Sequence, residues 1–387
     1  MYLDLKTDKI FKMITIQNLT FGGTFTYVTP DLPPPPSAYL WSWGYNQVGG
    51  LGLGNTTGYS SPKQVGALPT WSVISAEYLH NVAITTDGKL WTWGNNASDG
   101  RLGLGDKTDR SSPTQVGSLT TWAKASAGAN HTVAIRTNGT LWSWGLGTNS
   151  ELGLGQGTSF SSPNQVGSLT NWSTISTGEY HSLSIKTDGT LWSWGRNSEG
   201  RLGDSSTSPR DSPVQVGSLT NWSKVSGGST HSLAVKTDGT MWSWGSNYHG
   251  QLGLSGGADR SSPVQIGSLN TWSNIQCGGT HSLAVKTDGT MWSWGRNNNG
   301  QLGDNSTSTR FSPVQVGALT NWSTVSGGTD FSLAIKTTGT LWAWGSNSYG
   351  KLGLGNTTGV SSPVQVGAAT SWADITTSYY HTLAIRS

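Results

Sequence analysis

Six of the seven histidines recur at one position of a repeating sequence: His80, His131, His181, His231, His281 and His381, with Phe331 at the equivalent place in the remaining unit. A ring of imidazoles would offer a set of zinc ligands. Packed sheets would hold these side chains about 10 Å or more apart, whereas a zinc–nitrogen bond is about 2 Å long. We therefore expect partly buried, structural histidines that hydrogen-bond to backbone at the start of a strand, and no metal site.

Other groups that could do chemistry are few. Several carboxylates, such as Asp188 and Asp238, fall in a recurring Thr-Asp-Gly turn, which explains them. Glu77 and Glu179 stand beside tyrosines and are expected to be contact residues, not acids or bases. The single cysteine, Cys277, allows no intrachain disulfide and has no evident activating partner. The sequence therefore predicts no catalytic residues, no cofactor and no enzymatic activity.

The composition is unusually poor in charge. Only 11% of the residues are Asp, Glu, Lys or Arg and the net charge is +3, against about 25% charged residues in an average domain. This disfavours nucleic-acid binding, which needs clustered basic residues. No run approaches 18 apolar residues, so we expect no membrane insertion. A polar, weakly charged surface favours a virion or extracellular location, with the cytoplasm as the alternative.

The tryptophans show the organisation that must position these residues. A Trp-x-Trp pair, Trp41 and Trp43, is followed by Trp71, and this group of three occurs seven times and accounts for all 21 tryptophans. Each step is 50 residues except one of 51, between the second and third groups. Self-similarity at such a period is typical of repeat architectures.

One unit, residues 222–267, contains four strand-like segments, called A to D here: 222–228, 231–236, 240–245 and 263–267. Thr-Asp-Gly between B and C is a hairpin signal, and the proline that opens D suits an edge strand. Seven such units predict an all-β fold: a seven-bladed β-propeller of four-stranded antiparallel blades over residues 38–387. A closed parallel solenoid is the alternative, although it would not require the tight hairpins.

The two ends of the repeat region complement each other. The sequence ends with HTLAIRS (381–387), which matches the first half of a motif that reads HSLAVKTDGTMWSWG in other units. AYLWSWG (38–44) matches the second half of the same motif. We predict that strands A and B from 372–375 and 381–386 join strands C and D from 39–44 and 63–66. The N- and C-terminal strands would then share one blade, two plus two, and close the ring.

The motifs WGSNYHGQLG (244–253) and GGTHSLA (278–284), repeated in register, resemble the regulator of chromosome condensation repeat family. The resemblance covers residues 38–387 and implies a seven-bladed propeller, here in a phage- or bacterial-type variant with regular repeats. Members of that family include a nucleotide-exchange factor for a small GTPase, light sensors, ubiquitin-ligase modules and bacterial β-lactamase inhibitors. Units of 50 or 51 residues leave no room for the wedge-like insertion on which exchange activity depends.

In a four-stranded meander, the A–B and C–D loops lie on one face, and these are the loops whose sequences vary. A constant framework with variable loops is typical of a binding surface, with neutral drift as the alternative. Tyrosine and arginine are frequent anchors of such surfaces. The candidate face comprises Tyr45, Tyr59, Glu77, Tyr78, Phe160, Glu179, Tyr180, Arg196, Arg210, Tyr248, His249, Arg296, Arg310, Phe311, Asp330, Phe331, Tyr349, Tyr379 and Tyr380.

Residues 1–37 lie outside the repeat. Residues 1–29 contain an alternating, hairpin-like segment that is too small to fold alone, and the proline-rich residues 30–37 form a stiff linker. We expect this segment to be an arm that docks to a partner by strand addition, with a disordered leader as the alternative. Its docking residues would be Ile14, Ile16, Leu19, Phe21, Phe25 and Tyr27.

These observations favour a non-enzymatic binding or structural protein. The predicted role is a phage virion or bacterial surface component that joins an assembly through its arm and contacts a protein or glycan through its variable face. The alternative is a soluble regulator of the repeat family, either an exchange-like factor or an enzyme inhibitor.

Overall fold

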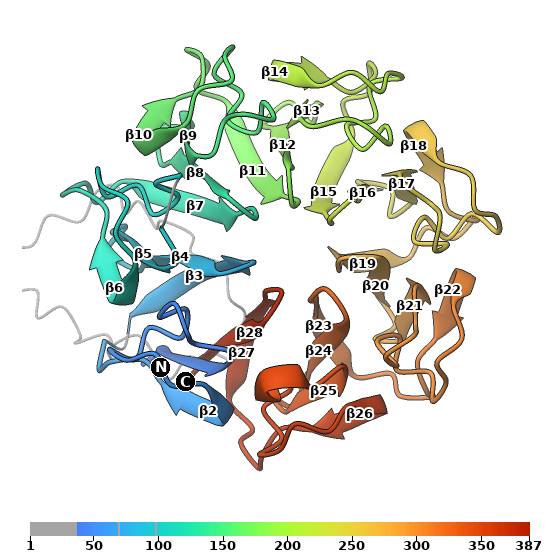
Figure 1. Ribbon diagram of the computed structural model, residues 1–387. Coiled ribbons are helices and arrows are strands. Elements are labelled where there is room, and N and C mark those ends of the chain that lie inside the picture. Colours follow the sequence, from blue (N-terminus) through green and yellow to red (C-terminus); the bar gives the residue numbers. More distant parts are fainter. Residues whose placement is uncertain (1–36, 69, 97–98) are drawn as a thin grey trace, which may run out of the picture. The chain divides into compact units, whose positions relative to one another are not determined.

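The computed structural model describes residues 37–68, 70–96 and 99–387. The predicted docking arm, with all six of its docking residues, and linker residues 30–36 lie outside the described residues. In the part that is described, the strands form seven four-stranded antiparallel sheets arranged as blades around a common axis (Figure 1). The predicted seven-bladed propeller is therefore confirmed. This part of the chain has no helix long and apolar enough to cross a membrane.

Each blade runs from strand A at the centre to strand D at the rim. The blades are numbered 1 to 7 in the order in which their A strands occur along the chain. The A strands are β3 (Trp71–Glu77), β7 (Trp122–Ala127), β11 (Trp172–Thr177), β15 (Trp222–Gly227), β19 (Trp272–Cys277), β23 (Trp322–Gly327) and β27 (Trp372–Thr377). The B strands are β4 (His80–Thr85), β8 (His131–Arg136), β12 (His181–Lys186), β16 (His231–Lys236), β20 (His281–Lys286), β24 (Phe331–Lys336) and β28 (His381–Arg386).

The C strands are β5 (Leu90–Gly94), β9 (Leu141–Gly145), β13 (Leu191–Gly195), β17 (Met241–Gly245), β21 (Met291–Gly295), β25 (Leu341–Gly345) and β1 (Tyr39–Gly44). The D strands are β6 (Arg110–Gln115), β10 (Phe160–Gln165), β14 (Arg210–Gln215), β18 (Arg260–Gln265), β22 (Arg310–Gln315), β26 (Val360–Gln365) and β2 (Tyr59–Gln64). One short 3-10 helix, η1 (Ser348–Gly350), lies in the C–D loop of blade 6.

The predicted position of strand D was wrong by about half a strand. The segment expected at 263–267 begins three residues earlier, at Arg260, which pairs with Gly245. The register then shifts before Val264 pairs with Ser243. Pro263 falls inside this irregular stretch, and because D is an edge strand, the missing amide proton of the proline breaks no internal ladder.

The ring is closed by a blade built from both ends of the repeat region. Strand β1 pairs with β28 over six residues, from Tyr39 opposite Arg386 to Gly44 opposite His381. The order in this sheet is β2-β1-β28-β27, as the broken sequence phrase predicts. The A strand of this blade runs on to Thr377, two residues beyond the predicted end.

The core lies between neighbouring blades, where the tryptophan face of one blade meets the aliphatic face of the next. In blade 4, the rings of Trp242 and Trp244 approach Trp222 edge-on, with centroids 6.0 and 6.4 Å away. Ala234, on the strand between them, is small enough to leave room for the three indoles. Leu183 and other aliphatic residues of blade 3 cover this group, so the tryptophans are core residues, not an exposed stacking platform.

Removal of residues 381–387 should open the ring, because β28 supplies the partner of β1 and buries Leu383 and Ile385. We expect the melting temperature to fall by about 10 °C or more and the radius of gyration from small-angle scattering to increase. A chain without residues 1–29, which lie outside the sequence repeat, is the control. A melt that is equal in the two truncated chains would contradict closure through β28.

Candidate functional site

A backbone carbonyl in each C–D loop joins one blade to the next. In blade 5 the carbonyl oxygen of Gln301 accepts a hydrogen bond from Trp344 Nε1 and another from Ser332 Oγ, both at 2.8 Å. Both donors belong to blade 6. The same double acceptance recurs at the other six junctions, where the acceptors are the carbonyl oxygens of Gly50, Arg101, Glu151, Arg201, Gln251 and Lys351.

The recurring histidines extend this junction. His281 Nε2 lies 2.8 Å from Ser332 Oγ, whose single proton is already donated to Gln301. The imidazole must therefore donate from Nε2, which fixes its tautomer. His80, His131, His181 and His231 make the same contact with the next blade, and His381 donates to Asn81 Oδ1 at 2.6 Å.

The structural role expected for the histidines is confirmed, but two details of the prediction were wrong. All six side chains are fully buried, not partly buried, and they bond to a side chain of the next blade, not to backbone. Burial lowers the pKa of each, to about 3 for His131, His231 and His381 and about 4 for His281. Within the described ranges, no group of three or more histidine, cysteine or acidic side chains could hold a metal ion.

Blade 6 replaces the histidine with Phe331, whose ring is fully buried. The prediction that Phe331 belongs to a ligand-binding face was therefore wrong, because its side chain cannot reach solvent. The ammonium group of Lys351 lies over this ring, 4.9 Å from its centroid, and also pairs with Asp330. In this blade, a phenyl ring in a cation–π contact with Lys351 therefore replaces the imidazole.

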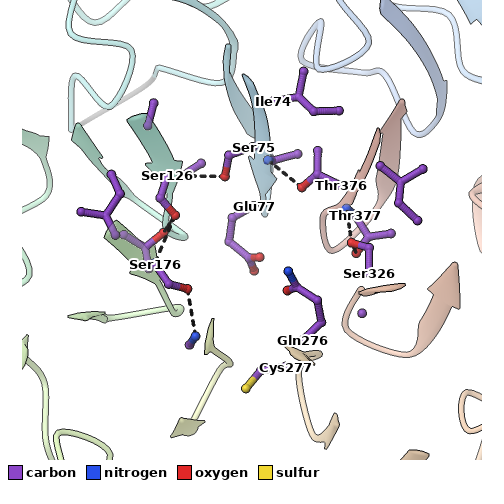
Figure 2. Close-up of a pocket in the computed structure, with 18 of the residues that line it drawn as sticks. Ile74, Ser75, Glu77, Ser126, Ser176, Gln276, Cys277, Ser326, Thr376 and Thr377 are labelled. Carbon is purple, nitrogen blue, oxygen red and sulfur yellow. Dashed lines mark hydrogen bonds between the residues drawn. The ribbon is translucent and has the colours of Figure 1, made fainter. Parts of the chain in front are cut away.

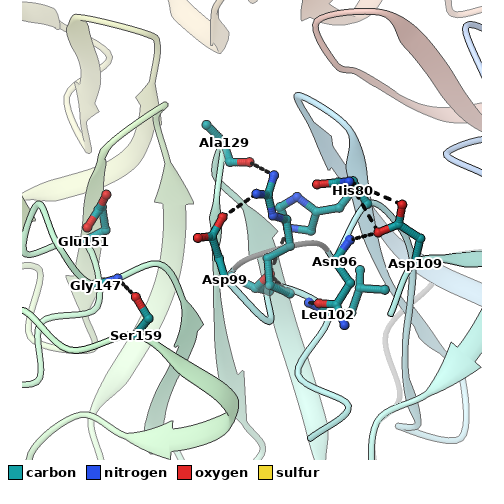
Figure 3. A network of polar contacts seen from close by, with 12 residues as sticks. His80, Asn96, Asp99, Leu102, Asp109, Ala129, Gly147, Glu151 and Ser159 are labelled. Carbon is teal, nitrogen blue, oxygen red and sulfur yellow. Dashed lines mark hydrogen bonds and ion pairs between the residues drawn. The ribbon is translucent and has the colours of Figure 1, made fainter. Parts of the chain in front are cut away.

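The C–D loops are held by buried side chains as well as by backbone. Asn96 donates from Nδ2 to the carbonyl oxygen of Asp106 and accepts the amide of Leu102, while its own amide donates to Asp109 at 2.6 Å (Figure 3). The Arg101 guanidinium donates to the carbonyl oxygen of Ala129 at 3.1 Å. These hydrogen bonds hold the described part of this C–D loop together and link it to blade 2.

A central cavity of about 290 Å³ is lined by the A strands of all seven blades (Figure 2). Most of its hydroxyl groups have a structural partner. Ser126 Oγ, for example, accepts the amide of Thr177 in the next blade at 3.1 Å, and equivalent bonds form at five other junctions. Gln276 stands at this position in blade 5; its side chain faces the cavity, and its Oε1 accepts a hydrogen bond from Ser226 Oγ at 3.4 Å.

Glu77 projects into the same cavity, at a position where five other blades have glycine. Burial and, to a smaller extent, the nearby charge of Glu179 raise its pKa to about 8, against a smaller opposing effect of the Tyr78 amide. Asp374 also lines the cavity, and burial raises its pKa to about 6. Burial raises the pKa of the Cys277 thiol to about 12, so it is not a reactive thiolate.

Five of the candidate residues form one contiguous tyrosine cluster across the seam of the ring, where the closing blade 7 meets blades 6 and 1. They are Tyr45, Tyr78, Tyr349, Tyr379 and Tyr380. Tyr380 is at its centre, with ring centroids 4.4 to 5.9 Å from the other four. Tyr349 and Tyr379 are 53% and 38% exposed. The cluster draws on blades 6, 7 and 1, so it exists only when the ring is closed.

The remaining candidates are dispersed around this face. Arg196 lies over the ring of Tyr180 at 5.7 Å, and Arg296 is half-buried in the next C–D loop but one. Tyr248 and His249 contact each other at 4.8 Å.

Several candidates near the rim have structural partners instead. Arg210 and Arg310 form ion pairs of 2.6 and 2.8 Å with Asp204 and Asp304 inside their own C–D segments. Lys63 lies over the ring of Tyr59 at 5.3 Å. The two other aromatic residues begin or follow the start of D strands: Phe160 and Phe311.

Sequence reasoning missed Gln276 and Asp374, which face the cavity. Both could have been found by comparing the units position by position: Gln276 stands where six units have serine or threonine, and Asp374 is the only acidic residue at its position.

Replacing a junction histidine with phenylalanine, His281→Phe, should flatten the pH dependence of stability. The pKa of His281 is about 4 when folded and near 6.5 when unfolded, so the unfolded chain binds the proton first and stability falls as pH falls through this window. Each such histidine contributes a slope of up to about 1.4 kcal/mol per pH unit. Denaturant unfolding at pH 4.5 and 6 measures it. The reverse change, Phe331→His, should steepen the slope; an unchanged slope in both variants would contradict the assignment.

Glu77→Gln should stabilise the fold at alkaline pH. Because the pKa of Glu77 is about 8 when folded and near 4.5 when unfolded, the unfolded chain releases this proton first and stability falls as pH rises between these values. Glutamine cannot ionise, so we expect a higher melting temperature than wild type at pH 8.5 and an equal one at pH 4. A difference of the same size at both pH values would exclude an ionisation effect.

Comparison with known proteins is consistent with this geometry. The family model described as "Regulator of chromosome condensation (RCC1) repeat" matches seven consecutive stretches, which are 38–84, 87–135, 138–185, 188–235, 238–285, 288–335 and 338–385. The ultraviolet-B receptor UVR8 of Arabidopsis thaliana is 34% identical over 119 residues, 30% of this chain and 27% of the receptor. The regulator of chromosome condensation of Xenopus laevis is 27% identical over 141 residues, 35% of this chain and 32% of that protein. The matched region thus spans about a third or less of these relatives.

Solved structures show the same fold. Yeast RCC1 (Prp20), crystallised bound to Kap60, superposes with a TM-score of 0.81 at 20% identity and covers 91% of this chain and 89% of its own. Human WBSCR16 superposes with a TM-score of 0.81 at 19% identity, covering 90% and 99%. The relatives named here are eukaryotic, so they give no support to a phage or bacterial variant or to a virion location. With seven repeats that fill the propeller, the chain belongs to the regulator of chromosome condensation (RCC1) repeat family.

Proposed function

We propose that this chain is a non-enzymatic regulator that binds a partner protein through the face carrying its A–B and C–D loops. The observation that carries this proposal is the tyrosine cluster. Tyrosine rings combine a large apolar area with a polar tip and are enriched at the anchor positions of protein interfaces. In this chain the cluster interrupts a surface otherwise rich in serine, threonine, asparagine and glycine.

The relatives favour a regulator over a displayed structural component. Those that match bear the names of a light receptor and a chromosome-condensation regulator, and another is the mitochondrial protein RUG3. A solved relative, Prp20p of Saccharomyces cerevisiae, has been described with its binding to Gsp1p and histones. We therefore propose a protein ligand over a glycan, and an intracellular location over a virion.

We propose binding, not nucleotide exchange, as the action of this face. All seven units have nearly the same length, and the C–D loops return directly to their D strands without an inserted wedge. The cluster also depends on the seam, since Tyr349, Tyr380 and Tyr78 come from three blades. A partner that covers the cluster would therefore recognise only the closed ring.

A photoreactive benzoylphenylalanine placed at Tyr379 should cross-link one discrete partner in cells of the source organism. The same residue placed at Leu219, which is 44% exposed in a D–A loop on the opposite face, is the matched control. Addition of Tyr349→Ala to the Tyr379 probe should weaken the adduct by about tenfold, the effect of losing one interface anchor. Equal adducts from both faces, or none from either, would contradict the proposal.

A further inference from the structure

We propose that the mouth of the central cavity binds the guanidinium group of an arginine presented by a partner protein. The site consists of the carboxylates of Glu77 and Glu179 and the rings of Tyr78 and Tyr379. This inference rests on the proposed function, because it names the chemistry that the same face recognises.

The two carboxylates lie at a constriction formed by the A–B loops. Glu77 and Glu179 line it together, and most of the other lining residues are glycines, such as Gly228 and Gly278. The two acidic side chains are close enough for the charge of Glu179 to act on the pKa of Glu77. Neither carboxylate forms an ion pair with any residue in the described part of the chain. With a pKa of about 8, Glu77 is mostly protonated in the free protein at neutral pH, and a bound cation favours its ionised form, so the pair is complementary to a cation.

The polar groups around Glu77 are otherwise used by the fold. Ser75 and Thr376 accept backbone amides of neighbouring blades, and Gln276 Oε1 accepts a hydrogen bond from Ser226 Oγ at 3.4 Å, whereas Glu77 points into the open space (Figure 2). Glu77 replaces a glycine of the repeat, and its carboxylate interacts locally with the Tyr78 amide rather than with a neighbouring blade, so it is available to a ligand.

The tyrosines add a second element of complementarity. The ring centroids of Tyr78 and Tyr379 are 5.6 Å apart, and the rings meet edge-on. Tyr78 follows Glu77 in the chain, and Tyr379 lies across the seam in blade 7. Aromatic faces attract cations, and a planar guanidinium can stack on a ring while its N–H groups bond to carboxylates. An ammonium group lacks this planar fork, so arginine fits better than lysine.

The size of the constriction places the ligand at the mouth. The space between the A–B loops is about 20 Å³, which is room for roughly one water molecule. A guanidinium group would therefore stop above the glycines and not pass into the larger cavity below.

Binding of short labelled peptides to the full-length protein tests this site by fluorescence anisotropy. The probes are fluorescein-Gly-Ser-Gly-Arg-Gly-Ser and the same peptide with lysine or glutamine in place of arginine. We expect the arginine peptide to bind, the lysine peptide to bind more weakly and the glutamine peptide not to bind. The double variant Glu77→Gln, Glu179→Gln should weaken binding by about tenfold or more, because it removes both acidic groups at nearly constant shape.

The matched control is Asp211→Asn, which removes one acidic group at a D strand near the rim and should leave the affinity unchanged. Thermal melts verify that each variant is folded. Equal binding of the three peptides, or an unchanged affinity in the double variant, would overturn the arginine site. If the cross-link from Tyr379 persists in the double variant, the proposed protein-binding function stands and the arginine site fails. If the double variant loses both the cross-link and the binding of the arginine peptide, the protein-binding function and the arginine site both stand.

Discussion

The propeller depends on one doubly used carbonyl oxygen at each junction between blades. It accepts an indole N–H and a hydroxyl or amide donor of the next blade, as Gln301 does from Trp344 and Ser332. The glycine of the same loop must stay small, because a Cβ at Gly303 would lie 2.7 Å from Trp344 Nε1. A residue whose carbonyl is so constrained can vary in its side chain, and these positions hold glycine, arginine, glutamate, glutamine and lysine. The motif of the repeat therefore records backbone geometry as much as side-chain packing.

This constraint explains what could be predicted from the sequence. The tryptophan period and the broken phrase at the two ends were sufficient for seven blades and their closure, because each unit buries its apolar face only against its neighbours. The start of strand D was misplaced because Pro263 looks like a boundary, whereas an irregular edge strand accommodates it. The histidine partner was missed because the hydroxyl that accepts from His281 lies 51 residues away in the next unit. A contact between two units cannot be predicted from the sequence of one unit alone.

The candidate site was predictable in its face but not in its grouping. Alternation of constant and variable loops indicated which end of the blades to consider, and five tyrosines from that set meet at the seam. Their proximity required the ring, since Tyr45 and Tyr380 are distant in the chain but have centroids 5.4 Å apart. The opposite error was made for Phe331, which differs from the residue of the other units but is buried inside the fold. Variation alone does not distinguish a contact residue from one that compensates a local change.

Closure through β1 and β28 also bears on how the protein is made. Trp43 leaves the ribosome among the first residues of the propeller, yet its indole partner, the carbonyl oxygen of Lys351, is among the last. At ordinary rates of translation, the interval is on the order of tens of seconds. During that time β1, near the N-terminal end of the growing chain, has an unpaired edge, and Trp43 lacks its hydrogen-bond partner. A nascent chain that stalls before its final strand keeps both, so chaperones and proteases can distinguish an unfinished ring from a finished one by its edge.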